Sequence, residues 1–584
     1  MAIGAYSLEQ YSMTAGLLLS FFGLLAAAVA GRRDILAAFK EPGLGKRKLI
    51  YPAVLLAVFL VAEIGMVHPT QQLFFDDAIN QAMAQQLLNS GQAWMCNYGT
   101  PSACYSGSTF HEPIGAAFNL AIGFALFGVQ RNVAYAVGLF AAALSVMVAF
   151  LVGYLLFRNL TAALFSELLM ALSPVLLVWA MPTQSDIYLM CYSLIAMLFL
   201  LVFSRKKSAA TFTMALMSLA LATYMKVDAF LLVPVLAVMY LAVSDSSFSA
   251  SARKTYAMME RHSLDTRLLV ILLLFVVAVS PEFIYAANES ATGDYGAVGT
   301  IQNTCGNFAA GQVQGTFSLH DFSYNLCANL LFWIDAYQSQ SIMQPLFFTI
   351  LAIVGVGGLL LYSRNVAIAL AFWFVAFFLL YTAFYAGAVI YGVDWRFMLS
   401  LVPPASLLGG FGCYTIVEWS TEAFRTRLRN VGRGLRMRPV HMRFATVAVI
   451  LFVIAYSVAY MAPQLTVEPW NIGQANNARF YENMVYNYSH QYIPGGCIVF
   501  SYDPTLYNIN GFAARQLSDI YNSGIYQNMS AQYGCAVVDY GYWCYTPNNL
   551  CSSLGQTYNM TPLFTDRFGN TSMVYGFYLV KPKA

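Results

Sequence analysis

Long apolar runs separated by short polar segments dominate the chain from its N-terminus to about residue 462. About 20 apolar residues are needed to span a bilayer as a helix, and by this length the pattern predicts twelve spans. They cover residues 12–31, 50–67, 133–156, 160–180, 186–203, 209–225, 228–244, 268–287, 344–363, 366–385, 398–419 and 445–462. The chain is therefore predicted to be a polytopic α-helical membrane protein.

Two shorter patterns lie between the second and third spans. Apolar residues recur on one face of residues 78–88, which predicts an interfacial helix capped by Asp76 or Asp77. Residues 114–127 are apolar but too few to cross the bilayer, which predicts a juxtamembrane or re-entrant helix. We therefore expect two outer helices in this loop.

The last 122 residues differ from the rest because they are polar and rich in Tyr. Short apolar runs alternate there with Gly, Asn and Pro, which predicts strands joined by turns. We expect three parts: residues 1–49, with an extra N-terminal transmembrane helix and a basic loop; a transmembrane domain at 50–462; and a small α/β domain at 463–584.

Charge adds an orientation to this pattern. The chain is 59% hydrophobic and only 10% charged, and its net charge of +3 hides a strong asymmetry. Of its 30 basic residues, 22 fall in alternate loops, namely 32–49, 158, 204–208, 245–267, 364 and 420–444. Because Lys and Arg in short loops stay on the cytoplasmic side, we expect the N-terminus, loops 68–132 and 288–343, and the C-terminal domain outside. The asymmetry indicates membrane orientation and argues against nucleic-acid binding.

The cysteines follow the same topology, since disulfides persist in oxidising compartments. Cys96 and Cys104 share one outer loop and Cys305 and Cys327 share another, so we predict one bridge within each pair. The C-terminal domain holds four more, whose three pairings stay open: Cys497, Cys535, Cys544 and Cys551. The alternative is that all of these cysteines are reduced and buried.

The order of several motifs resembles a known family. Phe75-Asp76-Asp77-Ala78 follows a span, and Glu112-Pro113, Leu126-Phe127-Gly128 and Arg131 come before the next. Further matches are Ser173-Pro174, Ser185-Asp186, Tyr224-Met225-Lys226, and Arg396-Phe397-Met398-Leu399 before Pro403-Pro404. Together, over about residues 50–420, they resemble the GT-C glycosyltransferases of the protein O-mannosyltransferase and lipid A aminoarabinose transferase type. That family more often has Glu at the position of Asp77 and Tyr at that of Phe397.

The resemblance implies an inverting transfer of one sugar from a polyprenyl- or dolichyl-phosphate carrier to an acceptor hydroxyl at the outer membrane face. A hydroxyl needs a positioned base to become a good nucleophile, and we assign that role to Asp76, with Asp77 as helper or orienter. Their alternative role is to cap the following helix. The acceptor is a protein, a lipid or a glycan, and the protein is expected in the cell membrane.

Cations are needed where the lipid phosphate leaves. Lys226, Arg396 and Arg131 each stand at the outer end of a predicted span, so all three are candidates to bind the carrier phosphate. Snorkelling to the headgroups is the alternative for each, and Arg396 could also pair with Asp394.

Glu112 and Asp186 are predicted on the same side as Asp76 and Asp77, and belong to the candidate substrate site. Three or four such oxygens could hold Mg²⁺, Mn²⁺ or Ca²⁺. The alternative is that Glu112 and Asp186 make only local hydrogen bonds, so the sequence leaves a metal cofactor open.

Two alternative functions remain. Asp539-Tyr540-Gly541-Tyr542-Trp543 is similar to the WWDYG signature of oligosaccharyltransferase catalytic subunits, but Val537 and Val538 replace the two tryptophans and the segment is predicted to be a strand. The second alternative is a transporter or flippase of lipid-linked substrates, which the lack of an inverted repeat of broken helices disfavours.

Overall fold

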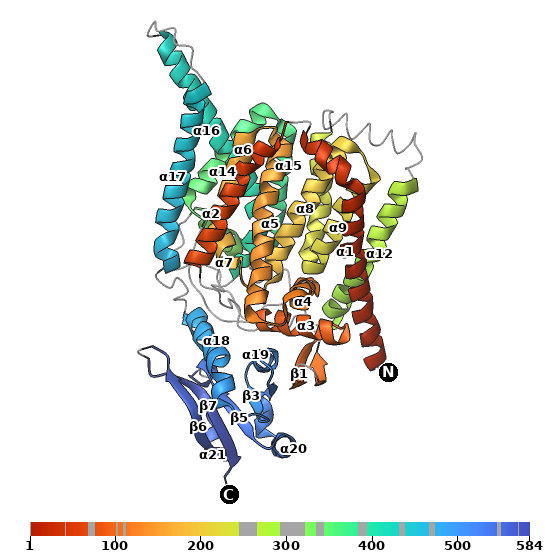
Figure 1. Ribbon diagram of the computed structural model, residues 1–584, viewed down its shortest axis with the longest axis vertical. Helices are drawn as coiled ribbons and strands as arrows, with labels where there is room; N and C mark the ends of the chain where they lie inside the picture. The colour runs from red at the N-terminus through yellow and green to blue at the C-terminus, as the bar shows by residue number, and fades with distance from the viewer. Residues whose placement is uncertain are drawn as a thin grey trace.

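The helices form a bundle, with a smaller sheet domain at one end, in the computed structural model of the chain (Figure 1). The structure describes residues 2–40, 43–67, 76–100, 103–108, 113–244, 266–292, 322–334, 344–383, 394–430, 439–466, 473–545, 551–569 and 571–583. The bundle consists of α1 (Ala2–Lys40), η1 (Lys46–Leu49), α2 (Ile50–Met66), α5 (Arg131–Phe157), α6 (Leu160–Ala171), α7 (Pro174–Trp179), α8 (Ser185–Lys206), α9 (Ala209–Met225), η2 (Val227–Leu231), α10 (Leu232–Val243), α12 (Thr266–Thr292), α13 (Phe322–Trp333), α14 (Leu346–Tyr362), α15 (Arg364–Ala383), η4 (Asp394–Ser400), α16 (Val402–Asn430) and α17 (Pro439–Thr466).

Every predicted span coincides at least in part with one of these helices. Six described segments are long and apolar enough to cross a membrane by length and composition: Tyr11–Lys40, Arg47–Gly65, Arg131–Phe157, Ser185–Lys206, Arg267–Tyr285 and Arg364–Ala383. Others, such as Leu160–Ala171 and Leu346–Tyr362, are apolar but shorter. The helical membrane class is confirmed, whereas the number of twelve spans stays a prediction.

The centre of the bundle is held by close helix contact at glycines. A Cβ at Gly355 of α14 would overlap the carbonyl oxygen of Leu408 of α16, and a Cβ at Gly412 of α16 would overlap that of Leu351 of α14. Such approach is open only to residues without a side chain, as at many helix contacts in membranes. These glycines therefore set the spacing of α14 and α16.

Two further helices, α3 (Asp76–Ser90) and α4 (Gly115–Phe127), lie at the end of the bundle nearest the sheet domain (Figure 1). Both match helices expected from the sequence. Most of the first half of α3 is buried, and α4 is apolar but too short to cross the membrane. Some residues of the candidate site lie on these two helices or next to them.

In the part of the chain that the structure describes, the sheet domain has seven strands in the order β2-β1-β4-β3-β5-β7-β6. Strands β3 (Ile498–Ser501), β4 (Ala513–Gln516) and β5 (Ala536–Tyr540) are parallel, and β6 (Tyr558–Arg567) and β7 (Val574–Pro582) extend the sheet antiparallel. The helical elements of this region are α18 (Gly473–Tyr492), α19 (Pro504–Ile509), η5 (Leu517–Tyr521), α20 (Ser523–Tyr533), η6 (Tyr542–Tyr545) and α21 (Leu554–Thr557). The predicted mixture of helices and strands is confirmed.

The other two strands come from the loop between the second and third predicted spans and were not predicted from the sequence. Strands β1 (Met95–Thr100) and β2 (Ala103–Ser108) form an antiparallel pair, and Gly99 of β1 pairs with Ala514 of β4. The loop between the second and third spans therefore joins the C-terminal sheet. This pairing fixes the loop that carries Asp76 and Asp77 to a domain about 400 residues further along the chain.

The C-terminal cysteines pair as Cys497–Cys535 and Cys544–Cys551, which selects one of the three open pairings. Cys327 is disulfide-bonded, while its predicted partner Cys305 lies outside the described residues. Cys96 and Cys104 fall on β1 and β2, but their side chains also lie outside the described part of the chain. Cys191 and Cys413 are buried free thiols in the bundle.

Candidate functional site

Asp77 is fully buried and binds the turn between α7 and α8. Its Oδ1 accepts hydrogen bonds from the backbone N–H of Thr183 (2.8 Å), from the Thr183 hydroxyl (3.1 Å) and from Nε2 of Gln184 (2.8 Å). A buried carboxylate with several donors is well satisfied. Asp77 therefore holds a turn that is more than 100 residues away in the sequence, and its role as helper or orienter in catalysis stays a prediction.

Next to this turn, Asp186 in the first turn of α8 pairs with two cations. Its Oδ1 lies 2.7 Å from Nζ of Lys226, and its Oδ2 lies 3.7 Å from Nε of Arg396. Asp186 is fully buried, while the side chains of Lys226 and Arg396 are 13% and 10% exposed. The sequence predicted all three as site residues, and the fold brings them together from α8, the end of α9 and η4.

Gln184 joins the two clusters. It donates to Asp77 through Nε2, and its Oε1 accepts a 2.5 Å hydrogen bond from Arg396. The amide thereby connects the outer-loop helix α3 to the cation in η4, and fixes the orientation of both partners. The primary amide suits this place because its NH2 group donates while its oxygen accepts.

An aromatic ring lies beneath the cations. Nζ of Lys226 is 4.0 Å from the centre of the Phe397 ring, and the guanidinium carbon of Arg396 is 5.2 Å from it. A cation over an aromatic face is attracted by the negative potential of the ring. Phe397 thus restricts the same two charged groups that Asp186 pairs with.

Lys226 reaches this position because α9 ends there. It is the C-cap of α9, with an extended backbone conformation, and the 3₁₀ helix η2 follows it directly. Asp228, in the first turn of η2, lies close enough to Lys226 and Asp186 to interact with both charges. The break between α9 and η2 therefore turns a lysine from the helix end toward the pair formed by Asp186 and Arg396.

Arg131 is engaged by the sheet domain. Its Nε lies 2.9 Å from Oε1 of Glu482 in α18, and the Tyr135 hydroxyl donates to the same oxygen at 2.7 Å. The guanidinium also lies 4.6 Å from the centre of the Tyr486 ring. Arg131 therefore ties α5 to α18, and its predicted contact with a phosphate stays a prediction.

Two predicted residues cannot be placed. Asp76 begins α3, but its side chain lies outside the described residues, as does Glu112. Within the described part of the chain, no group of three His, Cys, Asp or Glu side chains could hold a metal ion. The predicted set of Asp76, Asp77, Glu112 and Asp186 includes both residues that cannot be placed, so a metal stays open.

Sequence reasoning did not identify Thr183 and Gln184 as site residues. They stand directly before the Ser185-Asp186 motif, in the short polar segment between two apolar runs. Polar residues are common at any turn, so the sequence does not distinguish these two; in the structure both are buried and contact Asp77. Phe397 was noted as a departure from the family pattern and not as a partner of the cations.

The Asp539 motif is part of the sheet core. Asp539 lies on β5 as predicted, is fully buried, and accepts hydrogen bonds from the hydroxyls of Tyr481 and Ser501 (2.8 Å for Ser501). Burial raises the pKa of Asp539 to about 7 and that of nearby Asp503 to about 7. This environment gives the motif a structural role and does not favour an acceptor-binding one.

The bundle, helices α3 and α4 and the C-terminal sheet domain define a membrane protein of the GT-C class. Residues 111–285 match the family of dolichyl-phosphate-mannose-protein mannosyltransferases. The crystal structure of ArnT from Cupriavidus metallidurans in the apo state is similar with a TM-score of 0.54 at 13% identity, over 90% of this chain and 97% of that one.

The structure of the same ArnT bound to undecaprenyl phosphate gives a TM-score of 0.53 at 13% identity, over 91% and 97% of the two chains. The oligosaccharyltransferase of Archaeoglobus fulgidus gives 0.48 at 13% identity, over 88% and 73%. No curated protein matches the chain in sequence. The resemblance and the GT-C fold predicted from the sequence are confirmed.

Proposed function

We propose that the protein transfers a monosaccharide from a polyprenyl- or dolichyl-phosphate carrier to an acceptor hydroxyl at the outer membrane face, with inversion at the anomeric carbon. The observation that carries this proposal is the convergence of Lys226 and Arg396 on buried Asp186, at the end of the bundle where α3 and α4 lie. The family match and the bound undecaprenyl phosphate of ArnT support the same donor class.

Lys226 and Arg396 bind the phosphate of the carrier in this proposal. Their side chains keep a small exposed fraction, 13% for Lys226 and 10% for Arg396, whereas their carboxylate partner is fully buried. The ammonium of Lys226 has three donor hydrogens, and the described residues supply one hydrogen-bond acceptor for them, Asp186. Asp186, Gln184 and Phe397 therefore hold the cations in place before the substrate arrives, so that little reorganisation is needed as the phosphate leaves.

Asp76 is the general base that removes the proton of the acceptor hydroxyl. Asp77 is less suited to this role, because its Oδ1 already accepts three hydrogen bonds in a buried site. Asp76 is its direct neighbour at the start of α3. The hydrogen bonds of Asp77 thus orient the helix terminus from which Asp76 acts, and Asp77 is a positioning residue.

The donor half of the proposal is tested by binding of undecaprenyl phosphate to the purified full-length protein. We expect Lys226→Gln and Arg396→Gln each to weaken this binding by about tenfold or more, because each removes a charge-assisted contact. Asp566→Asn, an exposed change in β6, is the control. Unchanged affinity in both Gln variants would remove the cations from the donor site.

The catalytic half is tested in cells that carry the chain, by mass analysis of the glycosylated envelope material that is lost when the gene is deleted. Asp76→Asn should lower product formation by about 10²–10⁴-fold while the purified variant still binds undecaprenyl phosphate. Asp77→Asn keeps the Oδ1 acceptor and should be affected much less. Full complementation by Asp76→Asn would refute the assignment of the base.

A further inference from the structure

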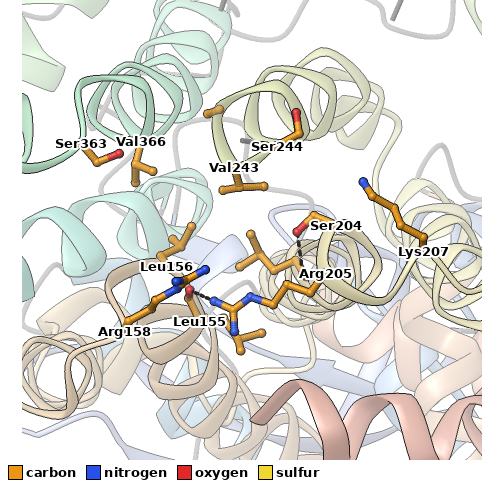
Figure 2. Close-up of a pocket in the computed structure, with 12 residues that line it drawn as sticks. Leu155, Leu156, Arg158, Ser204, Arg205, Lys207, Val243, Ser244, Ser363 and Val366 are labelled. Atoms are coloured by element: carbon orange, nitrogen blue, oxygen red, sulfur yellow. Dashed lines mark hydrogen bonds between the residues drawn. The ribbon is translucent and has the colours of Figure 1, made fainter. Parts of the chain in front are cut away.

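A polar cavity lies between the ends of α5, α8 and α10 and the junction of α14 with α15 (Figure 2). Its volume is about 640 Å³. Among the described residues its charged lining is formed by Arg158, Arg205 and Lys207, accompanied by three serines and without any acidic residue. Leucine and valine side chains complete the wall, so the cavity combines positive charge with an apolar surface.

This cavity is at the opposite end of the bundle from the candidate active site. Asp186 is in the first turn of α8 and Lys207 is its C-cap, so nearly the whole length of α8 separates them, about 32 Å at 1.5 Å per residue. That distance matches the thickness of about 30 Å of a bilayer core. By the charge distribution, the cavity faces the cytoplasmic leaflet.

Two of its cations occupy unusual backbone positions. Arg158 and Lys207 have φ angles of 50° and 52°, and they are the only non-glycine residues with positive φ in the described part of the chain. Each is the C-cap that ends a long helix, a place where glycine is common because a Cβ is unfavourable in the left-handed conformation. Both exceptions line the same cavity, so two cationic side chains stand there at positions where glycine would be less strained.

The three cationic side chains of the cavity differ in the contacts that they make. Arg205 donates to the carbonyl oxygen of Leu155 at the end of α5, and so stabilises the helix terminus (Figure 2). Lys207 donates to the Tyr240 hydroxyl at 2.8 Å and lies over its ring. The side chain of Arg158 is exposed and makes no hydrogen bond or ion pair with any residue that the structure describes, while its backbone N–H donates to the carbonyl oxygen of Tyr154. Arg158 and Lys207 are therefore the groups that can bind an anion without loss of helix capping.

We propose that this cavity binds the phosphate headgroup of a membrane lipid from the cytoplasmic leaflet. Basic pockets between transmembrane helices on the cytoplasmic side suit such headgroups. The volume lies within the range of roughly 300–1,000 Å³ of small-molecule sites, which is far more space than one inorganic phosphate needs. The apolar residues beside the cations, such as Leu156 and Val243, provide a surface for the start of the acyl or prenyl chain.

The test measures lipid binding to purified full-length protein by native mass spectrometry, with phosphatidylglycerol, undecaprenyl phosphate and inorganic phosphate as separate probes. Arg158→Gly and Lys207→Gly remove the charge and relieve the unfavourable backbone conformation, so thermal stability should stay the same or rise. Arg364→Ala removes an exposed cation from the start of α15, outside the cavity lining, and is the matched control.

We expect each glycine variant to weaken binding of the preferred lipid by about fivefold, and the double variant by about thirtyfold, with no change in Arg364→Ala. Preference for phosphatidylglycerol would identify a phospholipid headgroup, and preference for undecaprenyl phosphate would identify a polyprenyl one; either result supports the proposal. Equal binding in the double variant, an equal loss in Arg364→Ala, or displacement of the lipid by millimolar inorganic phosphate would overturn it.

Discussion

The C-terminal domain should lose stability as the pH rises, because two of its carboxyl groups are buried. Asp503 and Asp539 are both fully buried, and burial raises the pKa of each from an ordinary value of 3.8 to about 7. Between these values the folded domain keeps both protons, whereas the unfolded chain has released them. Stability is therefore greatest below about pH 4, falls as the pH rises, and reaches its lower level above about pH 7.

The magnitude follows from the size of the shift. A difference of about 3 pKa units at about 1.4 kcal/mol per unit gives about 4 kcal/mol for one carboxyl over the whole window. Between pH 5 and pH 6, each buried carboxyl should thus lower the free energy of unfolding by about 1.4 kcal/mol. The change is large compared with the net stability of 5–15 kcal/mol that is typical of a folded protein.

Asp539→Asn separates this effect from the hydrogen bonds. The amide oxygen can still accept from the Tyr481 and Ser501 hydroxyls, but it does not titrate. Hydrogen exchange of the β5 amides, corrected for the intrinsic rate, measures the opening free energy of the sheet at each pH. The variant should lose about half of the pH slope, whatever its stability at low pH.

Asp566→Asn changes an exposed carboxyl in β6 and should keep the full slope. The reasoning is wrong if Asp539→Asn and the parent protein have the same slope between pH 4 and pH 7. An increase of stability with pH would contradict it as well, because that sign requires carboxyls whose pKa is lowered by folding.

Three further predictions concern the packing and the site. Gly355→Ala should destabilise the bundle by about 1–3 kcal/mol because its Cβ overlaps the α16 backbone, whereas Gly357→Ala in the same helix meets open space; thermal unfolding in detergent compares them, and equal midpoints would contradict the packing argument. Asp77→Ala should cost about 1–3 kcal/mol in the same assay, since buried donors of the α7–α8 turn lose their acceptor, and an unchanged midpoint would refute it. Glu482→Gln should weaken the contact of α18 with α5 by about 1 kcal/mol, seen as faster hydrogen exchange in α18.

The fold was predictable wherever a local pattern decides it. The apolar runs located the spanning helices, and the period of apolar residues after Asp77 located α3, because each signal lies within a short window of sequence. The pairing of Gly99 with Ala514 has no local signal, since a hairpin and a distant strand become neighbours only when the whole domain assembles. For the same reason, the sequence analysis treated the loop between the second and third spans and the C-terminal domain as separate parts of the molecule.

The candidate site was predictable in its charges and not in its connections. Lys226, Arg396 and Asp186 are conspicuous because charges are rare near apolar runs, and the family pattern ordered them. Gln184 is an ordinary residue of a polar turn, and its role appears only when its amide is seen between Asp77 and Arg396. A neutral bridging side chain leaves no compositional signal.

The bridge through Gln184 also explains how the acidic loop and the cations could act together. Asp77 accepts from the amide nitrogen and Arg396 donates to the amide oxygen, so reversing the amide would set its NH2 group against the Arg396 donor and its oxygen against the Asp77 carboxylate oxygen. Only one orientation is therefore favourable, and it links the start of α3 to η4 in a defined geometry. In the proposed enzyme this places the base next to Asp77 at a fixed distance from the cations that receive the leaving phosphate, which is the positioning that a direct displacement at one carbon requires.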